Sequence, residues 1–294
     1  MTGRLLLIGG DSEIAAATLA VIRRSGLAAA ATTRRGDDLR GRTFLDLAAP
    51  LDDWRPPADV SAACIFAAVG NLVDCHRDPI GSALINVTRA IELAELLAAR
   101  GNYVLYLSTD KVFGGDRAYM PADAPLAPIS EYGRQKAQTD AHLQRMIVAG
   151  APVGILRLAK IFSPGTGLFP QWRAALRERK PVRAFCDMMV APTLADDVAA
   201  AIVALLGARE AGVWQLSGAR DIAYAEAAAY IARQIGADAR LVEAVPAASA
   251  AMPPGSTPLH TTLDSTGLAR FGIAPREPWP VIDAVLGAAA KDSC

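Results

Sequence analysis

Two short stretches of the sequence carry residue types that together could reduce a carbonyl group. Ser108 and Thr109 end an apolar run over residues 103–107, and Tyr132 and Lys136 stand four residues apart in a later segment. At that spacing two side chains share one helix face, so we expect the Lys136 ammonium to lie beside the Tyr132 phenol and to lower its pKa from about 10. Such a phenol can hand a proton to a developing alkoxide, while the hydroxyl pair holds the carbonyl. The alternative is an exposed tyrosine with a solvated lysine, but the strand that ends in Ser-Thr favours the chemical interpretation.

Apolar runs that alternate with helical patterns must position these residues. Through the first half of the chain this alternation is typical of a Rossmann-like, doubly wound parallel α/β sheet. Ligands then bind at the carboxyl ends of the strands, where Gly9, Arg34, Ala67 and the Ser108-Thr109 pair all fall. The expected strands span residues 4–8, 27–33, 43–47, 60–69, 103–107 and 153–158, and the expected helices include residues 80–100, 132–148 and 171–179.

The turn after the first expected strand resembles a dinucleotide-binding fingerprint, in which glycines let backbone N–H groups approach a pyrophosphate at a helix N-terminus. Against the pattern G-x-x-G-x-x-G, the chain keeps Gly9 but has Ser12 at the middle position and Ala15 at the last. Asp11 and Glu13 add negative charge beside the expected pyrophosphate. This departure leaves open a hypothesis from another class, a non-catalytic regulatory or binding subunit on the same fold.

Two arginines after the second expected strand bear on the choice of cofactor. In this architecture the residue after that strand meets the adenosine ribose, where an acidic side chain favours NAD and an arginine accommodates a 2′-phosphate. The chain has Arg34 and Arg35 there, and a guanidinium can pair bidentately with phosphate. We therefore expect NADP (NADPH), with NAD possible. The alternative is an ordinary pair of solvated loop arginines.

The composition describes a chain that can bury a sizeable core and excludes several classes of partner. Hydrophobic residues make up 52% of the 294 residues, and 30 basic side chains balance 30 acidic ones. A net charge of zero gives no broad electrostatic attraction to nucleic acid or to an anionic membrane. The histidines and the four cysteines lack metal-ligand spacing, so no metal site is expected. No signal segment or membrane-length apolar run is evident, so we expect a cytoplasmic protein.

Several longer stretches resemble the extended short-chain dehydrogenase/reductase superfamily, and most of all its dTDP-4-dehydrorhamnose reductase type. The resemblance is carried by residues 107–115, 131–136, 155–157, 191–198, 214–218 and 262–273, and it runs from about residue 4 to about residue 286. It implies that Thr109 holds the substrate carbonyl, that Tyr132 is the acid, and that Lys136 contacts Tyr132 and the cofactor ribose, with Ser108 assisting. It also implies a nucleotide-sugar substrate and a possible homodimer.

The remaining expected contacts follow from the strand ends and from the same resemblance. The residues expected to bind the cofactor are Gly9, Ser12, Glu13, Ile14, Arg34, Arg35, Asp46, Leu47, Ala67, Ala68, Val69 and Lys136. Asp46 stands where such proteins place an acid near the adenine. The residues expected to bind the substrate are Val69, Asn71, Ser108, Asp110, Tyr132 and Trp172.

One position separates the possible reactions. Nucleotide-sugar dehydratases of this superfamily carry Thr-Asp-Glu where this chain has Thr109-Asp110-Lys111. A lysine cannot replace that glutamate as a carboxylate base at neutral pH, so we expect NADPH-dependent reduction of a nucleotide-linked 4-ketosugar rather than dehydration. A nucleotide-sugar epimerase with bound NAD is also compatible with Lys111, although Arg34 and Arg35 argue against it.

The second half of the chain predicts a smaller mixed α/β substrate lobe. We expect residues 1–160 to form the NAD(P)-binding domain, with residues 190–218 returning to it, and residues 161–189 and 219–294 to form the lobe. A basic stretch around Trp172 offers cations and a stacking face to a nucleoside diphosphate, or alternatively forms a solvated helix face. The Pro-, Ala- and Ser-rich residues 247–258 are expected to be a loop that could line the substrate cleft.

Overall fold

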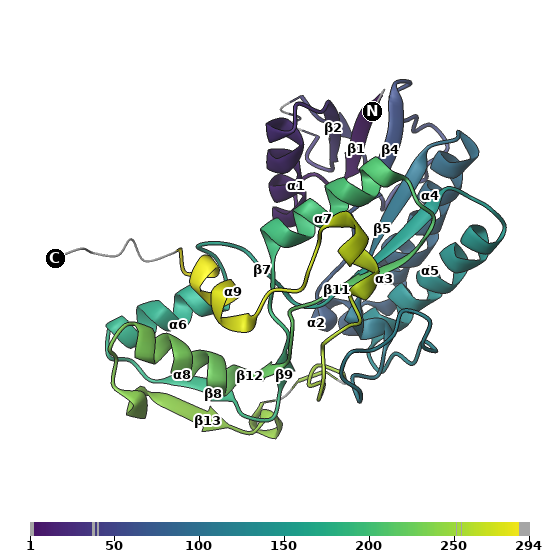
Figure 1. Cartoon of the computed structure of the whole chain (residues 1–294). Helices are drawn as coiled ribbons and strands as arrows, with labels where there is room; N and C mark the ends of the chain where they lie inside the picture. The colour runs from purple at the N-terminus through teal and green to yellow at the C-terminus, as the bar shows by residue number, and fades with distance from the viewer. Residues whose placement is uncertain (1–2, 37–38, 40, 251, 254, 288–294) are drawn as a thin grey trace.

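A parallel seven-stranded sheet forms the centre of the computed structural model, which describes residues 3–36, 39, 41–250, 252–253 and 255–287. Its strand order is β11-β6-β5-β4-β1-β2-β3, so the predicted Rossmann-like α/β fold is confirmed (Figure 1). The strands are β1 (Arg4–Ile8), β2 (Ala29–Thr33), β3 (Thr43–Phe44), β4 (Val60–Ile65), β5 (Tyr103–Thr109), β6 (Val153–Leu158) and β11 (Gly212–Leu216). Cys294 and the last residues of the predicted lobe lie outside the described residues.

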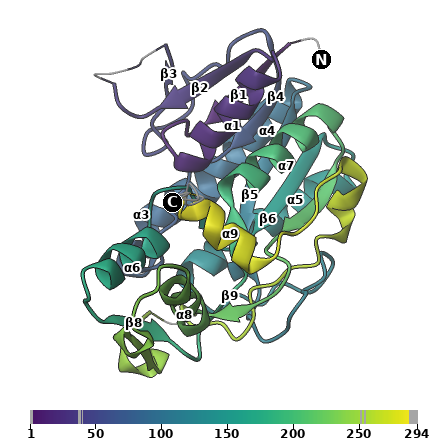
Figure 2. The same ribbon diagram turned by 60° about the vertical axis from the view of Figure 1, so that its left-hand side comes forward.

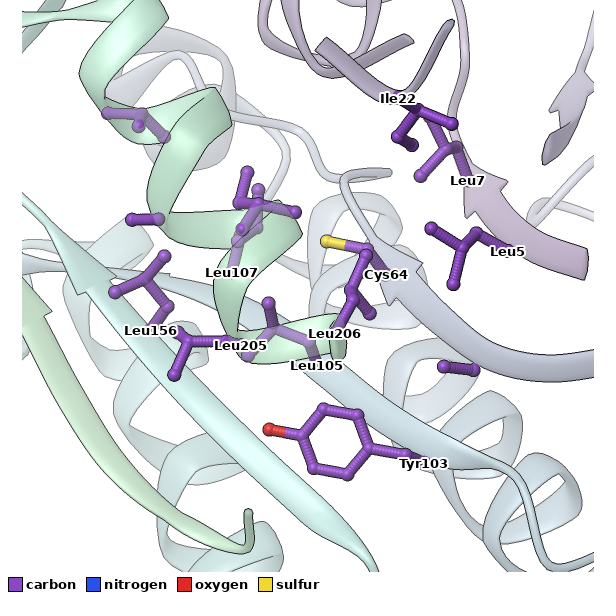
Figure 3. Packing of buried hydrophobic residues seen from close by; sticks show 14 of the residues in the cluster. Leu5, Leu7, Ile22, Cys64, Tyr103, Leu105, Leu107, Leu156, Leu205 and Leu206 are labelled. Atoms are coloured by element: carbon purple, nitrogen blue, oxygen red, sulfur yellow. The ribbon is translucent and has the colours of Figure 1, made fainter. Parts of the chain in front are cut away.

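Helices cover both faces of this sheet because successive strand residues point to opposite sides. Leu5 and Leu7 of β1 pack towards α1 (Glu13–Arg24) and α7 (Ala195–Ala208), whereas Leu6 and Ile8 pack towards α4 (Ala90–Ala99) and α5 (Glu131–Val148). Figure 3 shows the first of these layers, with Leu5 and Leu7 on the same side of the sheet as Leu205 and Leu206 of α7. Burial on both faces explains why these strands are continuous apolar runs.

Three of the expected strands are shorter in the structure than in the sequence-based prediction; the one expected over residues 27–33 begins at Ala29, and the other two end early. The prediction of a strand over residues 60–69 was wrong beyond Ile65, because the backbone N–H groups of Phe66 and Ala67 both turn to the Ile8 carbonyl. The expected strand over residues 43–47 ends at Phe44, and the Asp46 carboxylate then accepts a hydrogen bond from the backbone of Ala48. Both chain segments leave the sheet at its carboxyl edge, where loops form the site.

The expected helix over residues 80–100 is instead three consecutive segments. They are α3 (Pro79–Ala83), a π-helix η1 (Leu84–Arg89) and α4, and a further short helix α2 (Leu72–Arg77) precedes them. π-Helical turns inside α-helices are frequent at functional sites. Here the π-helix carries Asn86, whose side-chain oxygen accepts from the backbone of Val69 at 2.8 Å and whose amide donates to Gln135 of α5 at 2.8 Å. Asn86 therefore joins the loop after β4 to the helix that carries Tyr132.

A second hydrophobic core lies beside the sheet and belongs to the chain after β6. Its helices are α6 (Leu168–Arg177), α8 (Tyr224–Gln234) and α9 (Pro278–Val285), and its strands β8 (Val182–Phe185) and β13 (Val242–Val245) pair in parallel. Short two-residue pairs connect it to the rest, β10 (Thr193–Leu194) with β7 (Ile161–Phe162) and β12 (Ile222–Ala223) with β9 (Met189–Val190). Figure 2 shows α6, α8 and β8 grouped away from β1 to β3.

Gly154 of β6 offers a direct test of how tightly the sheet is packed. A Cβ atom at this position would lie 2.2 Å from the hydroxyl of Tyr103, which is buried and donates to the Glu210 carbonyl at 2.9 Å. We expect Gly154→Ala to lower the free energy of unfolding by about 1–3 kcal/mol, as overpacking does in a dense core. Urea unfolding measures this change.

Gly70→Ala is the matched control, since its Cβ would meet nothing within 4 Å, and its free energy of unfolding should stay within about 0.5 kcal/mol of the parent. Adding Tyr103→Phe to Gly154→Ala should recover part of the loss. Equal stability of Gly154→Ala and the parent would contradict the packing described here.

Candidate active site

Helix α5 is placed against the carboxyl end of β5 by a glycine in its first turn. Ser130 caps the helix, and its hydroxyl accepts a hydrogen bond from the backbone of Gly133 at 3.0 Å. A Cβ atom on Gly133 would lie 2.2 Å from the Lys111 carbonyl oxygen. Glycine therefore allows α5 to contact the short 3₁₀ helix η2 (Asp110–Val112) that follows Thr109. This contact brings the first turn of α5, with Tyr132, beside the end of β5.

Thr109, the last residue of β5, is held by its two neighbours in η2. Its hydroxyl donates to the Asp110 carboxylate at 3.0 Å and accepts from the backbone N–H of Lys111 at 3.2 Å. The Lys111 ammonium lies 3.7 Å from the Asp110 carboxylate. The Thr109 hydroxyl is thus held at the carboxyl end of β5, and the Lys111 ammonium is the counter-ion of the Asp110 carboxylate.

Lys136 is almost fully buried, with 2% of its surface exposed. Its ammonium donates to the Leu107 carbonyl at 2.6 Å and lies 3.9 Å from the centre of the Tyr106 ring. Burial lowers the pKa of Lys136 to about 7, because the charged form loses its water shell, while the charge of Asp140 opposes this effect. Lys136 therefore titrates close to neutral pH in this arrangement.

The expected lowering of the Tyr132 pKa was wrong for this structure. Burial raises the pKa of Tyr132 above its ordinary value, and the negative charge of Asp110 raises it further. The Lys136 ammonium is directed at the Leu107 carbonyl and the Tyr106 ring. Tyr132 is a neutral phenol at neutral pH, as a tyrosine with an ordinary pKa also is, and this is the protonation state that a proton donor requires.

The catalytic residues expected from the sequence share one cavity of about 740 Å³, the main cavity. Ser108, Thr109, Tyr132 and Lys136 all line it. Five other expected site residues line it as well, Ser12, Ile14 and Ala68 from the predicted cofactor site and Asn71 and Asp110 from the predicted substrate site. The main cavity thus opens at the carboxyl ends of β1, β4 and β5, as a doubly wound sheet predicts.

The turn between β1 and α1 is compact and its acidic residue is compensated. Gly9 has a φ of +90°, and a Cβ there would lie 2.7 Å from the Ala67 backbone nitrogen. The Asp11 carboxylate accepts from the Thr33 hydroxyl at 2.7 Å and pairs with Arg42. Glu13 is exposed. The charge of Asp11 is therefore directed at the end of β2.

The other expected cofactor residues lie around this turn but outside the lining of the main cavity. Arg34 and Arg35 are exposed directly after β2, and the backbone of Arg35 donates to the Thr33 hydroxyl at 3.1 Å. Leu47 is buried in the core between the sheet and α4. The rest of this group are Asp46 after β3, and Ala67 and Val69 in the loop after β4.

Trp172 lies in the core of the second part of the chain rather than on a solvated helix face. It is buried between Phe169, with ring centres 5.8 Å apart, and Tyr224, at 6.2 Å and edge-on. Trp172 also lines a second cavity of about 470 Å³, the lobe cavity, together with Phe162 and Arg183. One edge of the indole is therefore available to a ligand.

Some cavity residues were not identified from the sequence. Lys160, Ile161, Met188 and Tyr224 line both the main cavity and the lobe cavity and therefore join the two. They come from segments far apart in the chain, and no local pattern marks them.

The loop expected over residues 247–258 contributes Met252, Pro253, Ser256 and Pro258 to the lining of the main cavity, and Met252 lines the lobe cavity as well. Its contact with substrate stays a prediction.

Two expected absences concern metals and membranes. Among the residues that the structure describes, no cluster of three or more His, Cys, Asp or Glu side chains could hold a metal ion. Within the same residues, no helix is long and apolar enough to cross a bilayer.

The parallel sheet, the matching family and the reductase relatives together make the chain an NAD(P)-dependent oxidoreductase of the extended short-chain dehydrogenase/reductase type. The chain belongs to the family described as the RmlD substrate binding domain, whose model matches residues 3–286.

Named relatives and one solved structure agree with this family. A Haloferax volcanii protein named probable low-salt glycan biosynthesis reductase Agl14 is 32% identical over 193 residues, and this match spans 63% of each chain. The dTDP-4-keto-6-deoxy-D-glucose reductase of Streptomyces niveus is 29% identical over 95% of this chain and 94% of its own length. The dTDP-4-dehydrorhamnose reductase of Bacillus anthracis, solved in complex with NADP, has the same fold, with a TM-score of 0.79, 18% identity, and coverage of 97% of this chain and 98% of its own.

The buried ammonium of Lys136 predicts that stability rises with pH. Its pKa is about 7 in the folded protein and about 10.4 in an unfolded chain, so the unfolded state binds more protons between these values. Above about pH 10.4 Lys136 is neutral in both states, so the folded protein carries no cost of a buried charge. As the pH falls from there towards about 7, the unfolded state takes up a proton that the folded state lacks, and the free energy of unfolding decreases. Between pH 7 and pH 9 the free energy of unfolding of the parent should rise by about 2 kcal/mol relative to that of Lys136→Met. Urea unfolding of both proteins at both pH values measures this, and identical pH dependence would contradict it.

Proposed function

We propose that the protein reduces a nucleotide-linked 4-ketosugar with NADPH, in the manner of a dTDP-4-dehydrorhamnose reductase. The observation that carries this proposal is the convergence of Thr109, Tyr132 and Lys136 on one cavity at the end of β5. A neutral phenol that can give a proton, together with a hydroxyl and a cation that can stabilise developing negative charge, suits carbonyl reduction. The names of the relatives, two of which are reductases of dTDP-linked sugars, support the substrate class.

Each of the three residues has a distinct task in this proposal. The Tyr132 phenol gives its proton to the carbonyl oxygen as negative charge develops on that atom. The Thr109 hydroxyl donates a hydrogen bond to the same oxygen, for which it turns away from Asp110. The positive charge of Lys136, one helical turn further along α5, favours the phenolate that Tyr132 becomes after the transfer. Ser108 assists from the adjacent position.

The β1–α1 turn fits a dinucleotide, in spite of its departure from the glycine pattern. The Ser12 hydroxyl caps only the N–H of Ala15, so the N–H groups of Glu13 and Ile14 at the start of α1 have no acceptor within the helix and can bind a pyrophosphate. Asp11 is compensated by Thr33 and Arg42. NADPH supplies the hydride when bound.

The other expected cofactor contacts extend this site. Arg34 and Arg35 would hold the 2′-phosphate, and Asp46 and Leu47 the adenine. Gly9, Ala67, Ala68 and Val69 would let the dinucleotide pass over the strand ends, and Lys136 would reach its ribose. The retained catalytic cluster together with this turn favours an enzyme over a non-catalytic binding subunit.

The substrate would enter from the side of the lobe cavity. The sugar would lie against Asn71, Val69 and Asp110, next to Tyr132 and Ser108, and the nucleotide would extend to Trp172. Lys111, which faces Asp110 at 3.7 Å, supplies no carboxylate for elimination. Reduction therefore fits the residues better than dehydration, and the Arg34-Arg35 pair favours exchangeable NADPH over the tightly held NAD of an epimerase.

The two hydrophobic cores support a division of labour between two parts of the chain. We assign cofactor binding to residues 1–160 with 190–218, and substrate binding to residues 161–189 and 219–294. Within the second group, Leu268 packs in the core of the sheet, against α7 and β11. The C-terminal segment thus returns to the sheet before α9 rejoins the lobe.

Tyr132→Phe tests the proton donor. The variant should lower kcat/KM for NADPH-dependent reduction of a dTDP-linked 4-keto-6-deoxyhexose at least about 100-fold, because only the hydroxyl that supplies the proton is removed. NADPH oxidation followed by absorbance measures the rate, and the free energy of unfolding should stay within about 0.5 kcal/mol of the parent.

Tyr119→Phe is the matched control, since Tyr119 is exposed and its hydroxyl donates to the Ala219 carbonyl at 3.2 Å; its rate should equal that of the parent. Full activity in Tyr132→Phe would refute the assignment of the acid.

The paired replacement Arg34→Ser/Arg35→Ser tests the cofactor preference. Loss of a charge-assisted phosphate contact should raise KM for NADPH about 10- to 100-fold, while KM for NADH, which has no 2′-phosphate, stays nearly unchanged. Steady-state kinetics with both cofactors measure the ratio. Arg24→Ser, an exposed arginine in the last turn of α1, is the control. A parallel change in both KM values would show that the pair does not read the phosphate.

A further inference from the structure

A fully buried ion pair lies directly behind the wall of the main cavity. Arg157 of β6 donates through Nε to the Asp140 carboxylate of α5 at 2.8 Å, and neither side chain has any exposed surface. Burial of two charges carries a desolvation penalty that apolar residues of similar size would avoid. Stability alone therefore does not account for this pair, and its position suggests a task in the site.

The guanidinium of Arg157 is held rigidly in the sheet. Its Nη1 donates to the Ala122 carbonyl at 2.8 Å and lies 3.4 Å from the Gln215 side-chain oxygen. Its central carbon lies 5.0 Å from the centre of the Phe113 ring. Asp140 is thus fixed from the side of the sheet that faces α5.

The pair borders the catalytic residues on two sides. Ser108 is the direct neighbour of Arg157 across the β5–β6 ladder, so both side chains leave the sheet on the same face. Lys136 precedes Asp140 by one helical turn on α5, which gives the two side chains one helix face. Asp140 Oδ1 and the Ser108 hydroxyl oxygen are both buried, and neither has a hydrogen-bond partner among the described residues. The Ser108 hydroxyl nonetheless lies close enough to lower the pKa of Asp140, against the rise that burial causes.

The negative charge of Asp140 raises the pKa of Lys136, against the effect of burial. Lys136 itself donates to an uncharged acceptor, the Leu107 carbonyl. The other titratable groups on the elements around it are neutral or already paired: Tyr106, Tyr132 and Cys75, whose pKa values burial raises, Asp110 with Lys111, Arg89 with Glu92, and Glu95 with His142.

We propose that Asp140, clamped by Arg157, is a positioning residue that serves as the buried counter-charge of Lys136 and fixes it against the end of β5. The inference rests on the proposed reductase function, since it assigns Asp140 a task through Lys136 and not through contact with substrate. With the carboxylate in place the ammonium keeps its charge while it is cut off from water. Without it, Lys136 faces the guanidinium of Arg157 alone and loses its proton at lower pH.

The pH dependence of kcat/KM in Asp140→Asn tests this arrangement. The asparagine keeps the size and one acceptor oxygen but removes the charge, so the basic limb of the profile should move about one unit to lower pH. At a pH above the basic limb of the parent protein, this shift lowers kcat/KM roughly tenfold. At a pH below the basic limbs of both proteins, the difference in kcat/KM disappears. A limb that stays at the parental pH, whatever the loss of rate, would overturn the proposal.

Two further variants separate charge from packing. Asp140→Asn/Arg157→Gln removes both charges, so its basic limb should return towards that of the parent, whereas a second buried change would only add to a packing defect. A limb that remains where the single variant has it would overturn the proposal. Glu95→Gln is the control, because it removes an exposed carboxylate of α4 that pairs with His142 of α5 at 2.8 Å. The basic limb of its profile should stay in place, and a shift equal to that of Asp140→Asn would refute a specific role of Asp140.

A measurement on the unaltered protein covers the case in which these variants do not fold. The carboxyl carbon of Asp140, followed by NMR in isotope-labelled protein, should have the chemical shift of an ionised carboxylate at pH 7. A protonated Asp140 at that pH would overturn the proposal, because a neutral carboxyl group is no counter-charge. This readout needs no turnover, so a protein that lacks reductase activity altogether would refute the proposed function without deciding the role of Asp140.

Discussion

The hydrogen bond from the Lys136 ammonium to the Leu107 carbonyl joins helix α5 to the carboxyl end of β5, and the site is built on that junction. At 2.6 Å it fixes the register between the strand that ends in Thr109 and the helix that begins beside Tyr132. The approach is possible because Gly133 carries no side chain where the Lys111 carbonyl lies. A longer residue at that point would hold the helix away from η2 and separate the phenol from the hydroxyl.

The same junction determines the charges in the site. A buried ammonium is stabilised by a hydrogen-bond acceptor and by a nearby opposite charge. Here the Leu107 carbonyl is the acceptor, and the charge of Asp140 opposes the effect of burial on the pKa of Lys136. Burial also keeps Tyr132 neutral. The site therefore combines a donor that holds its proton at neutral pH with a cation whose own proton is lost close to it. Such opposed pKa values are common where acid–base chemistry occurs.

Apolar continuity made the sheet predictable, whereas local chemistry did not reveal how its ends are built. The run over residues 153–158 matches β6 residue for residue, and α5 was placed to within one residue at its start. The strand over residues 60–69 was overestimated because the carbonyl of Ile8, distant in sequence, captures the backbone after Ile65. The π-helix at Asn86 likewise depends on its contacts with Val69 and Gln135. The sequence-based prediction named Ser108, Thr109, Tyr132 and Lys136, which line one cavity. It gave the wrong direction for the Tyr132 pKa, because the burial of the phenol depends on tertiary packing. Lys160 and Tyr224 were missed for the same reason, since they join the two cavities only after the chain has folded.

Transfer of a labelled hydride tests the central claim most directly. The protein would be mixed with NADPH that carries deuterium at the transferable position of the nicotinamide and with a dTDP-linked 4-keto-6-deoxyhexose, and the sugar product would be analysed by mass spectrometry and NMR. Reduction at this site predicts one deuterium on carbon 4 of the product for each NADPH oxidised. A sugar that is recovered unreduced and unlabelled, with the cofactor unconsumed, would contradict the assignment of this site to ketosugar reduction.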